Sequence, residues 1–145
     1  MAKIDIATAK FLEGYMCSQA VLYSFCDDLQ LEKDIALKVA CGFGAGMSCR
    51  QEVCGAVTGG IMVLGAKYGR GEKEGRTATE STFAKTRELM RQFADRHGTV
   101  ICRQLLNGCD LMTPEGQKQY RDNDLLNKSC KGYVQSAVEI LERIM

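Results

Sequence analysis

Proline occurs only once in this chain, at position 114, so almost every stretch is free to be helical. Apolar residues recur at helical spacing along the sequence, as at Phe83, Met90 and Phe93. Alternating runs of β-branched residues, which are typical of strands, are absent. We therefore expect an all-α fold, a bundle of five to seven helices that forms one domain over residues 1–145.

Apolar periodicity and the positions of glycine divide the chain into expected helices. They are 4–13, 17–29, 33–41, 53–68, 77–97, 100–107 and 128–144, with a weaker helical turn after Pro114. The segment 53–68 is apolar on every side, so we expect it to lie in the centre of the bundle. Its glycines at 55, 59, 60 and 65 lower helix propensity, and they indicate close approach of a neighbouring backbone or a bound group.

Charge and hydropathy argue against several classes of partner. The chain has 19 Lys and Arg against 18 Asp and Glu, so no basic excess favours binding to nucleic acid. The longest uncharged apolar run, 53–66, is shorter than the roughly 20 residues that a membrane-spanning helix needs. The first residues lack the pattern of a secretory signal, so we expect a cytoplasmic protein without membrane insertion.

Cysteine is unusually frequent, with eight residues in the chain. In a reducing compartment stable disulfides are not expected, so the thiols either fill the core or carry redox or metal chemistry. The sequence contains no C-x-x-C, which argues against a zinc ribbon or a thioredoxin-type site. Any cysteine site must therefore be assembled from distant segments.

Four cysteines lie near expected helix starts: Cys17, Cys54, Cys102 and Cys130. Thr99 and Asn127, each three residues before one of them, are candidate N-caps. The unpaired N–H groups and partial positive charge of a first helical turn stabilise a thiolate, which is both the nucleophile and the metal ligand. Cys17 and Cys130 also begin apolar stripes, so we expect both to point into the bundle. The same positions suit small core residues equally well.

The remaining cysteines fall into two groups. Cys26 and Cys41 are expected in the core, whereas Cys49 and Cys109 lie in loops as candidate auxiliary ligands or resolving thiols. The glycine-rich loop 42–46 follows no strand and precedes no Lys-Ser/Thr pair, so a phosphate site is not favoured. We expect its amides to point toward sulfur instead.

Two further residues have mainly structural interpretations. His97, the only histidine, ends an expected helix, where the helix dipole favours the charged ring; a ligand or acid–base role is the alternative. Arg50 is expected to be an exposed loop residue, with a charge near a thiolate as the alternative. No Ser-His-Asp pattern supports hydrolase chemistry.

The run from Cys54 to Gly59 reads C-G-A-V-T-G and matches the pattern C-G-A-x-x-G. It lies between an upstream Cys17 and two downstream cysteines, Cys102 and Cys130. In these residues the chain resembles the C_GCAxxG_C_C family of redox-active proteins over nearly its whole length. The four cysteines of the family pattern would correspond to the four that lie near expected helix starts. The resemblance implies a redox role and an iron–sulfur or other metal centre.

Three functions fit these features. The first is electron transfer with a redox partner protein, through an iron–sulfur cluster or, alternatively, zinc, bound by Cys17, Cys54, Cys102 and Cys130 with Cys49 and Cys109 as further candidate ligands. The second is a metal-free thiol–disulfide oxidoreductase with Cys54 as the catalytic nucleophile. The third is a non-catalytic helical module that binds a partner or a second copy of itself as a homodimer.

Overall fold

The computed structural model describes residues 1–145 and consists of helices, their connections and one isolated β-bridge between Val53 and Ile101. Seven helices have seven residues or more: α1 Lys3–Leu12, α2 Cys17–Ser24, α4 Lys33–Ala40, α6 Gly55–Tyr68, α7 Arg76–His97, α9 Pro114–Asp122 and α10 Lys131–Ile144. The shorter elements are α3 Cys26–Leu29, η1 Cys41–Phe43, α5 Gly44–Met47, α8 Cys102–Leu105 and η2 Leu126–Cys130. The predicted all-α fold is confirmed. No helix is both long and apolar enough to cross a membrane.

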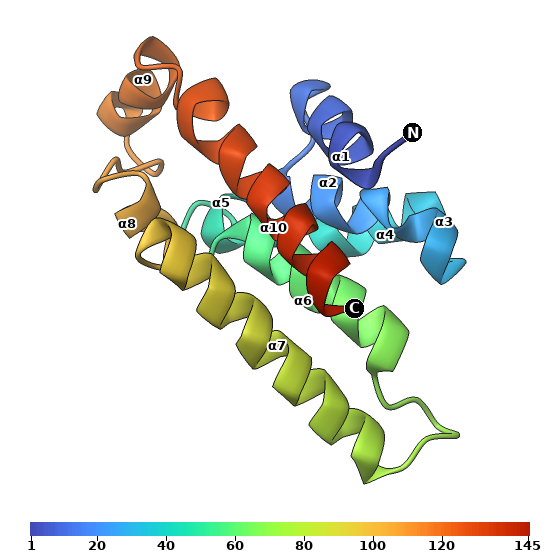
Figure 1. Ribbon diagram of the computed structural model, residues 1–145. Helices are drawn as coiled ribbons and strands as arrows, with labels where there is room; N and C mark the ends of the chain where they lie inside the picture. The colour runs from blue at the N-terminus through green and yellow to red at the C-terminus, as the bar shows by residue number, and fades with distance from the viewer.

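Helix α6 lies at the centre, in contact with α2, α7 and α10 (Figure 1). This position confirms the expectation for a helix that is apolar on every side. A Cβ added at Gly59 would stand 2.6 Å from the Ser18 carbonyl oxygen, and one at Gly60 would stand 2.8 Å from a Leu89 methyl group. These two glycines therefore permit the predicted close approach, whereas Gly65 has nothing within 4 Å of the same position.

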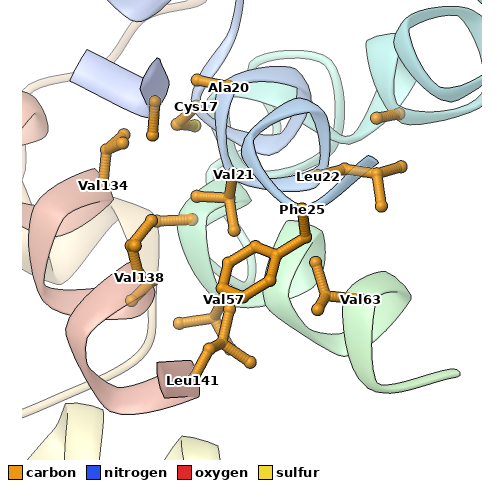
Figure 2. Packing of buried hydrophobic residues seen from close by; sticks show 14 of the residues in the cluster. Cys17, Ala20, Val21, Leu22, Phe25, Val57, Val63, Val134, Val138 and Leu141 are labelled. Carbon is orange, nitrogen blue, oxygen red and sulfur yellow. The ribbon is translucent and has the colours of Figure 1, made fainter. Parts of the chain in front are cut away.

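One hydrophobic core joins α1, α2, α6, α7 and α10. Val21 and Phe25 meet Val57 of α6 and Val138 and Leu141 of α10 (Figure 2). All five side chains are at most 2 % exposed, so they fix how these helices lie against one another.

The long helix α7 enters this core only through its C-terminal half. Leu89 and Phe93 are fully buried, but Phe83 is 56 % exposed, contrary to the expected stripe. The N-terminal half of α7, which contains Phe83, extends past the end of α6 (Figure 1).

Two expected helices are interrupted. The helix predicted over 17–29 stops at Phe25, whose φ of −104° and ψ of 0° separate α2 from α3. Just before this point the Ser24 hydroxyl donates to the Val21 carbonyl oxygen, a local bond of the kind that bends helices. The last helix begins earlier than predicted, with the π-helical turn η2, and runs through Cys130 into α10 without a break.

The two predicted N-caps are wrong. Asn127 lies inside η2 and donates its amide to Asp124. Ile101 takes the N-cap position of α8, and the Thr99 hydroxyl accepts from the Ile101 N–H at 3.1 Å. Cys130 is consequently placed within a continuous helix and not at a free helix start.

Helix α9 is longer than the predicted weak turn and stands apart from the central helices (Figure 1). Thr113 caps it by accepting from the Gly116 N–H at 3.0 Å, and Pro114 occupies its first turn. A second, smaller core of Cys102, Leu106 and Cys109 joins this end of the molecule to Tyr120. The arrangement places α9 over the N-terminal end of α10.

Candidate functional site

A cavity of about 310 Å³ lies where α1, α2, α6 and α8 to α10 meet. It is lined by all four predicted cysteines and by one further cysteine: Cys17, Cys54, Cys102, Cys130 and Cys49. Cys17 and Cys130 point into the bundle here, as expected. The cysteines of the site thus come from positions that are up to 113 apart in the sequence.

Backbone pairing sets Cys54 beside Cys102. The Cys54 N–H donates to the Val100 carbonyl at 2.8 Å, and the Cys102 N–H donates to the Glu52 carbonyl at 2.6 Å. These bonds flank the isolated bridge between Val53 and Ile101. Two short antiparallel segments therefore present the N-cap residue of α6 and the first residue of α8 to the same cavity.

Cys17 and Cys54 form a pair of thiols that share a hydrogen bond. Cys17 is the first residue of α2, Cys54 is the N-cap of α6, and their exposed fractions are 9 % and 6 %. A Cβ at Gly55 would overlap the Cys17 sulfur. The glycine after Cys54 therefore lets the start of α6 lie directly against Cys17.

The pair ionises first at Cys17. The hydrogen bond from Cys54 lowers the pKa of Cys17 to about 7, against the effect of burial, and hydrogen bonds from the backbone at Ala45 and Ser18 lower it further. The shared hydrogen bond and burial raise the pKa of Cys54 well above its usual value. Near neutral pH, Cys17 is thus the thiol of the pair that loses its proton, while Cys54 keeps its own.

The loop before α6 is left-handed over five consecutive residues, Ala45 to Cys49, with φ between 55° and 69°. For residues other than glycine this conformation costs roughly 1–2 kcal/mol each, and it persists where the surroundings impose it. Ala45 of this loop is one of the backbone groups that lower the pKa of Cys17, in keeping with the expectation that the amides of the loop lie toward a sulfur atom.

Gln51 holds this loop in place, and sequence analysis missed it. Its side chain is 2 % exposed, donates to the Cys109 carbonyl at 2.7 Å and accepts from the Leu111 N–H at 2.8 Å. It also forms a hydrogen bond with Cys102. No local pattern reveals this role, because the partners lie 51 to 60 positions away.

Cys102 and Cys130 stay protonated at neutral pH. Burial, followed by the proximity of Cys17 and Cys130, raises the pKa of Cys102 to about 12. Burial also raises the pKa of Cys130 to about 11, although a hydrogen bond from the Tyr120 hydroxyl opposes this. Tyr120, on α9, is the second site residue that the sequence did not indicate.

The two loop cysteines differ in position. Cys49 is half-buried and lines the cavity, beside Cys102. Cys109 is buried outside the cavity, and its thiol donates to the Gly116 carbonyl at 3.1 Å. Of the two predicted auxiliary residues, the structure therefore brings only Cys49 to the cavity wall.

The two cysteines that were expected in the core differ in burial. Cys26 is 1 % exposed, as predicted, and its thiol donates to the Leu22 carbonyl. Cys41 is exposed, contrary to prediction, because α4 ends at Ala40 and the chain turns outward in η1.

His97 has a structural environment. Its Nε2 lies 2.9 Å from the Ser136 hydroxyl, and its ring packs between Phe93 and Tyr133. Burial and the neighbouring Arg96 lower the pKa of His97, so the expected preference for the charged ring is wrong. Arg50 is exposed, as predicted.

All eight cysteines are free thiols. No three Cys, His, Asp or Glu side chains converge closely enough to hold one metal ion. The cavity as arranged, with two hydrogen-bonded thiols and two others held by Gln51 and Tyr120, therefore does not fit a single zinc or iron ion.

A sequence model of the family described as "Putative redox-active protein (C_GCAxxG_C_C)" matches residues 15–144. The matched range contains all five cysteines of the cavity wall. No curated protein and no solved structure matches the chain.

Proposed function

The chain belongs to the C_GCAxxG_C_C family of redox-active proteins, and from this premise we propose that Cys17 and Cys54 are a thiol–disulfide redox centre. The observation that carries the proposal is the hydrogen-bonded pair of thiols in which the pKa of Cys17 is lowered to about 7. Such a thiolate is both abundant at neutral pH and still nucleophilic. Its hydrogen-bond partner, the Cys54 thiol, is the candidate for disulfide formation.

The chemistry follows from the difference between the two thiols. The Cys17 thiolate attacks an electrophilic sulfur or oxygen, whose S–S or O–O bond breaks, and the leaving group takes up a proton. The sulfur of Cys54 then attacks the sulfur of Cys17, the remaining group departs, and a Cys17–Cys54 disulfide forms. The pair gives up two electrons in this cycle, and a dithiol on a redox partner protein would return them. Cys54, predicted from the sequence as the nucleophile, acts here as the resolving thiol.

The surroundings of Cys17 in the cavity favour a negative charge on only one of the neighbouring thiols at a time. Burial, and in addition the charge of ionised Cys17, raise the pKa of both Cys102 and Cys130, so these thiols remain neutral when Cys17 is a thiolate. The Ala45 backbone supports the charge on Cys17 without adding a second ionisable group. Among Cys17, Cys102 and Cys130, the cavity thus presents one thiolate, at Cys17.

The test is to oxidise the reduced protein with diamide in the absence of oxygen and to map disulfides by mass spectrometry. We expect the loss of two thiols and one Cys17–Cys54 disulfide. Cys17→Ser and Cys54→Ser should abolish it, whereas Cys26→Ala, a buried control remote from the cavity, should not. A disulfide between other residues, or none, contradicts the proposal.

An iron–sulfur centre for electron transfer is the second candidate function. The observation that favours it is that four family cysteines line one cavity, since four thiolates are the usual ligand set of such clusters. In the present arrangement the thiols would have to move toward one another to bind it. Iron and acid-labile sulfide in protein purified without oxygen, lost in Cys102→Ser and Cys130→Ser, would favour the cluster. A metal-free protein that also fails reconstitution would favour the dithiol.

A further inference from the structure

The cavity in front of the thiol pair is lined almost entirely by apolar side chains. Beyond the cysteines, its wall includes Phe11, Met16, Leu105, Leu106, Leu111 and Tyr133. Arg121, on the exposed side of α9, is the only charged residue that lines it. A volume of about 310 Å³ with such a lining suits a small organic molecule with an apolar body.

The position of the thiols selects against a protein disulfide as the oxidant. Cys17 and Cys54 are almost completely buried, and both line the cavity. Attack on a disulfide brings the two sulfur atoms to about 2 Å, so the flanking backbone of a protein substrate would have to enter as well. Glutathione disulfide, a large and multiply charged peptide, would lose its hydration in this apolar space.

Resting on the proposed dithiol function, we propose that the oxidant is an organic hydroperoxide with an apolar body, which the cavity binds with its peroxide group toward Cys17. A hydroperoxide carries its reactive O–O bond on a small polar end, so the rest of the molecule can remain in contact with apolar side chains. Its burial supplies binding free energy in proportion to the apolar area that leaves water.

In the proposed reaction, Cys17 and Cys54 together supply the two electrons and the proton that reduction of the hydroperoxide requires. The Cys17 thiolate attacks the terminal oxygen, the O–O bond breaks, and the departing alkoxide takes the proton of the Cys54 thiol and leaves as an alcohol. Cys17 is now a sulfenic acid, and the Cys54 thiolate attacks its sulfur. The S–O bond breaks, hydroxide leaves, and the Cys17–Cys54 disulfide remains. Two electrons from two sulfur atoms have reduced one O–O bond, and the dithiol partner regenerates the pair.

The experiment compares three oxidants at equal concentration on the reduced protein: cumene hydroperoxide, hydrogen peroxide and glutathione disulfide. Rates of Cys17–Cys54 disulfide formation are measured by acid quenching and mass spectrometry. Because the apolar body is bound only in the first case, we expect cumene hydroperoxide to react at least about tenfold faster than the other two. Equal or faster reaction with hydrogen peroxide or glutathione disulfide overturns the proposal.

A pair of neighbouring variants tests the cavity wall. Leu111 lines the cavity, whereas Met112 is 64 % exposed and does not. Leu111→Asn should reduce the preference for cumene hydroperoxide over hydrogen peroxide, and Met112→Asn should leave it unchanged. An unchanged preference in Leu111→Asn contradicts apolar binding at this wall.

Diamide separates failure of this proposal from failure of the dithiol function. If diamide forms the Cys17–Cys54 disulfide but cumene hydroperoxide shows no preference, the dithiol function stands and the substrate class is wrong. If neither oxidant forms that disulfide, both proposals are wrong.

Discussion

At position 55, one missing side chain decides how near two sulfur atoms can lie. Gly55 follows Cys54 directly, and a Cβ there would clash with the Cys17 sulfur. The hydrogen bond between the two thiols, and with it the lowered pKa of Cys17, therefore depends on a glycine. This gives the C-G step of the family pattern a physical reason.

We expect Gly55→Ala to displace the Cys17 thiol and to raise its pKa toward the ordinary value of 9.0. The thiolate fraction at pH 7 would then fall, and alkylation of Cys17 by iodoacetamide should slow by on the order of tenfold. Gly65→Ala is the matched control, because it lies on the same helix with nothing near its missing Cβ. It should leave alkylation unchanged and add about 0.5–1 kcal/mol of stability. Equal alkylation profiles in both variants would contradict the role of Gly55.

The thiol pKa values also predict how stability depends on pH in the reduced protein. Folding lowers the pKa of Cys17 to about 7, so its contribution is complete above pH 9 and is lost as the pH falls through 7. Folding raises the pKa of Cys102 to about 12 and of Cys130 to about 11, so their contributions hold below pH 9 and are lost as the pH rises through those values.

Urea unfolding of the reduced protein should therefore show stability rising from pH 7 to 9 and falling above it. In Cys17→Ser, the increase in stability between pH 7 and 9 should disappear. The decrease above pH 9 should remain, because Cys102 and Cys130 are still present. The same profile in both proteins would mean that Cys17 does not titrate as its surroundings indicate.

At the scale of elements, the left-handed turn before α6 depends on a clamp supplied from elsewhere in the chain. Five successive residues with positive φ do not form such a turn unaided. Gln51 ties the turn to the segment after α8 through Cys109 and Leu111. The strain in the loop is thus balanced by tertiary hydrogen bonds.

Gln51→Met keeps the length of the side chain but removes both of these bonds. The Cys109 carbonyl and Leu111 N–H are then left without their partner, and we expect a loss of at least about 1–3 kcal/mol in the free energy of unfolding. Gln119→Met, on the exposed face of α9, changes stability by less than about 0.5 kcal/mol. Both are measured by urea denaturation, and a small loss in Gln51→Met would show that the loop holds its conformation without the clamp.

Local patterns predicted the helices well, because helical periodicity is a property of neighbouring residues. The helices expected over 33–41 and 77–97 begin and end within one residue of α4 and α7. The break at Phe25 and the π-helical turn before α10 were not predicted, since tertiary packing and local side-chain bonds override periodicity there.

The site was only partly predictable. The family pattern selected the four cysteines, but only packing shows that they line one cavity. Tyr120, like Gln51, could not be predicted from a local pattern, because its hydrogen-bond partner Cys130 belongs to another helix. The relative acidity of the thiols also depends on the fold, because two of the groups that lower the pKa of Cys17, Cys54 and the Ala45 backbone, come from distant segments.

At the scale of the whole molecule, α9 stands apart from the central helices (Figure 1), and it contributes side chains to one side of the cavity wall. Gln117, Tyr120 and Arg121 share one face of this helix and line the cavity. The Tyr120 hydroxyl forms a hydrogen bond with Cys130, the residue directly before α10. This hydrogen bond links α9 to the rest of the cavity wall.

We expect Tyr120→Phe to loosen α9 without emptying the small core, because the ring is retained. Amide hydrogen exchange in α9 should accelerate about threefold to tenfold, as for the loss of one hydrogen bond, while exchange in α10 stays constant. Tyr15→Phe, at a tyrosine that does not line the cavity, should change neither. Unchanged exchange in α9 would mean that packing alone holds this helix.

The wall of the cavity comes from two parts of the chain, residues 11–55 and 102–133, and the residues between them contribute nothing to it. The hairpin of α6 and α7 brings the two parts together. Contacts between such distant segments form late in folding, because a long loop must close first. On a ribosome, the Cys17–Cys54 pair can meet before residue 102 has been synthesised, and nascent chains would then carry the thiol pair without its opposite wall. Pulse labelling during refolding should accordingly find Cys102 and Cys130 protected later than Cys26.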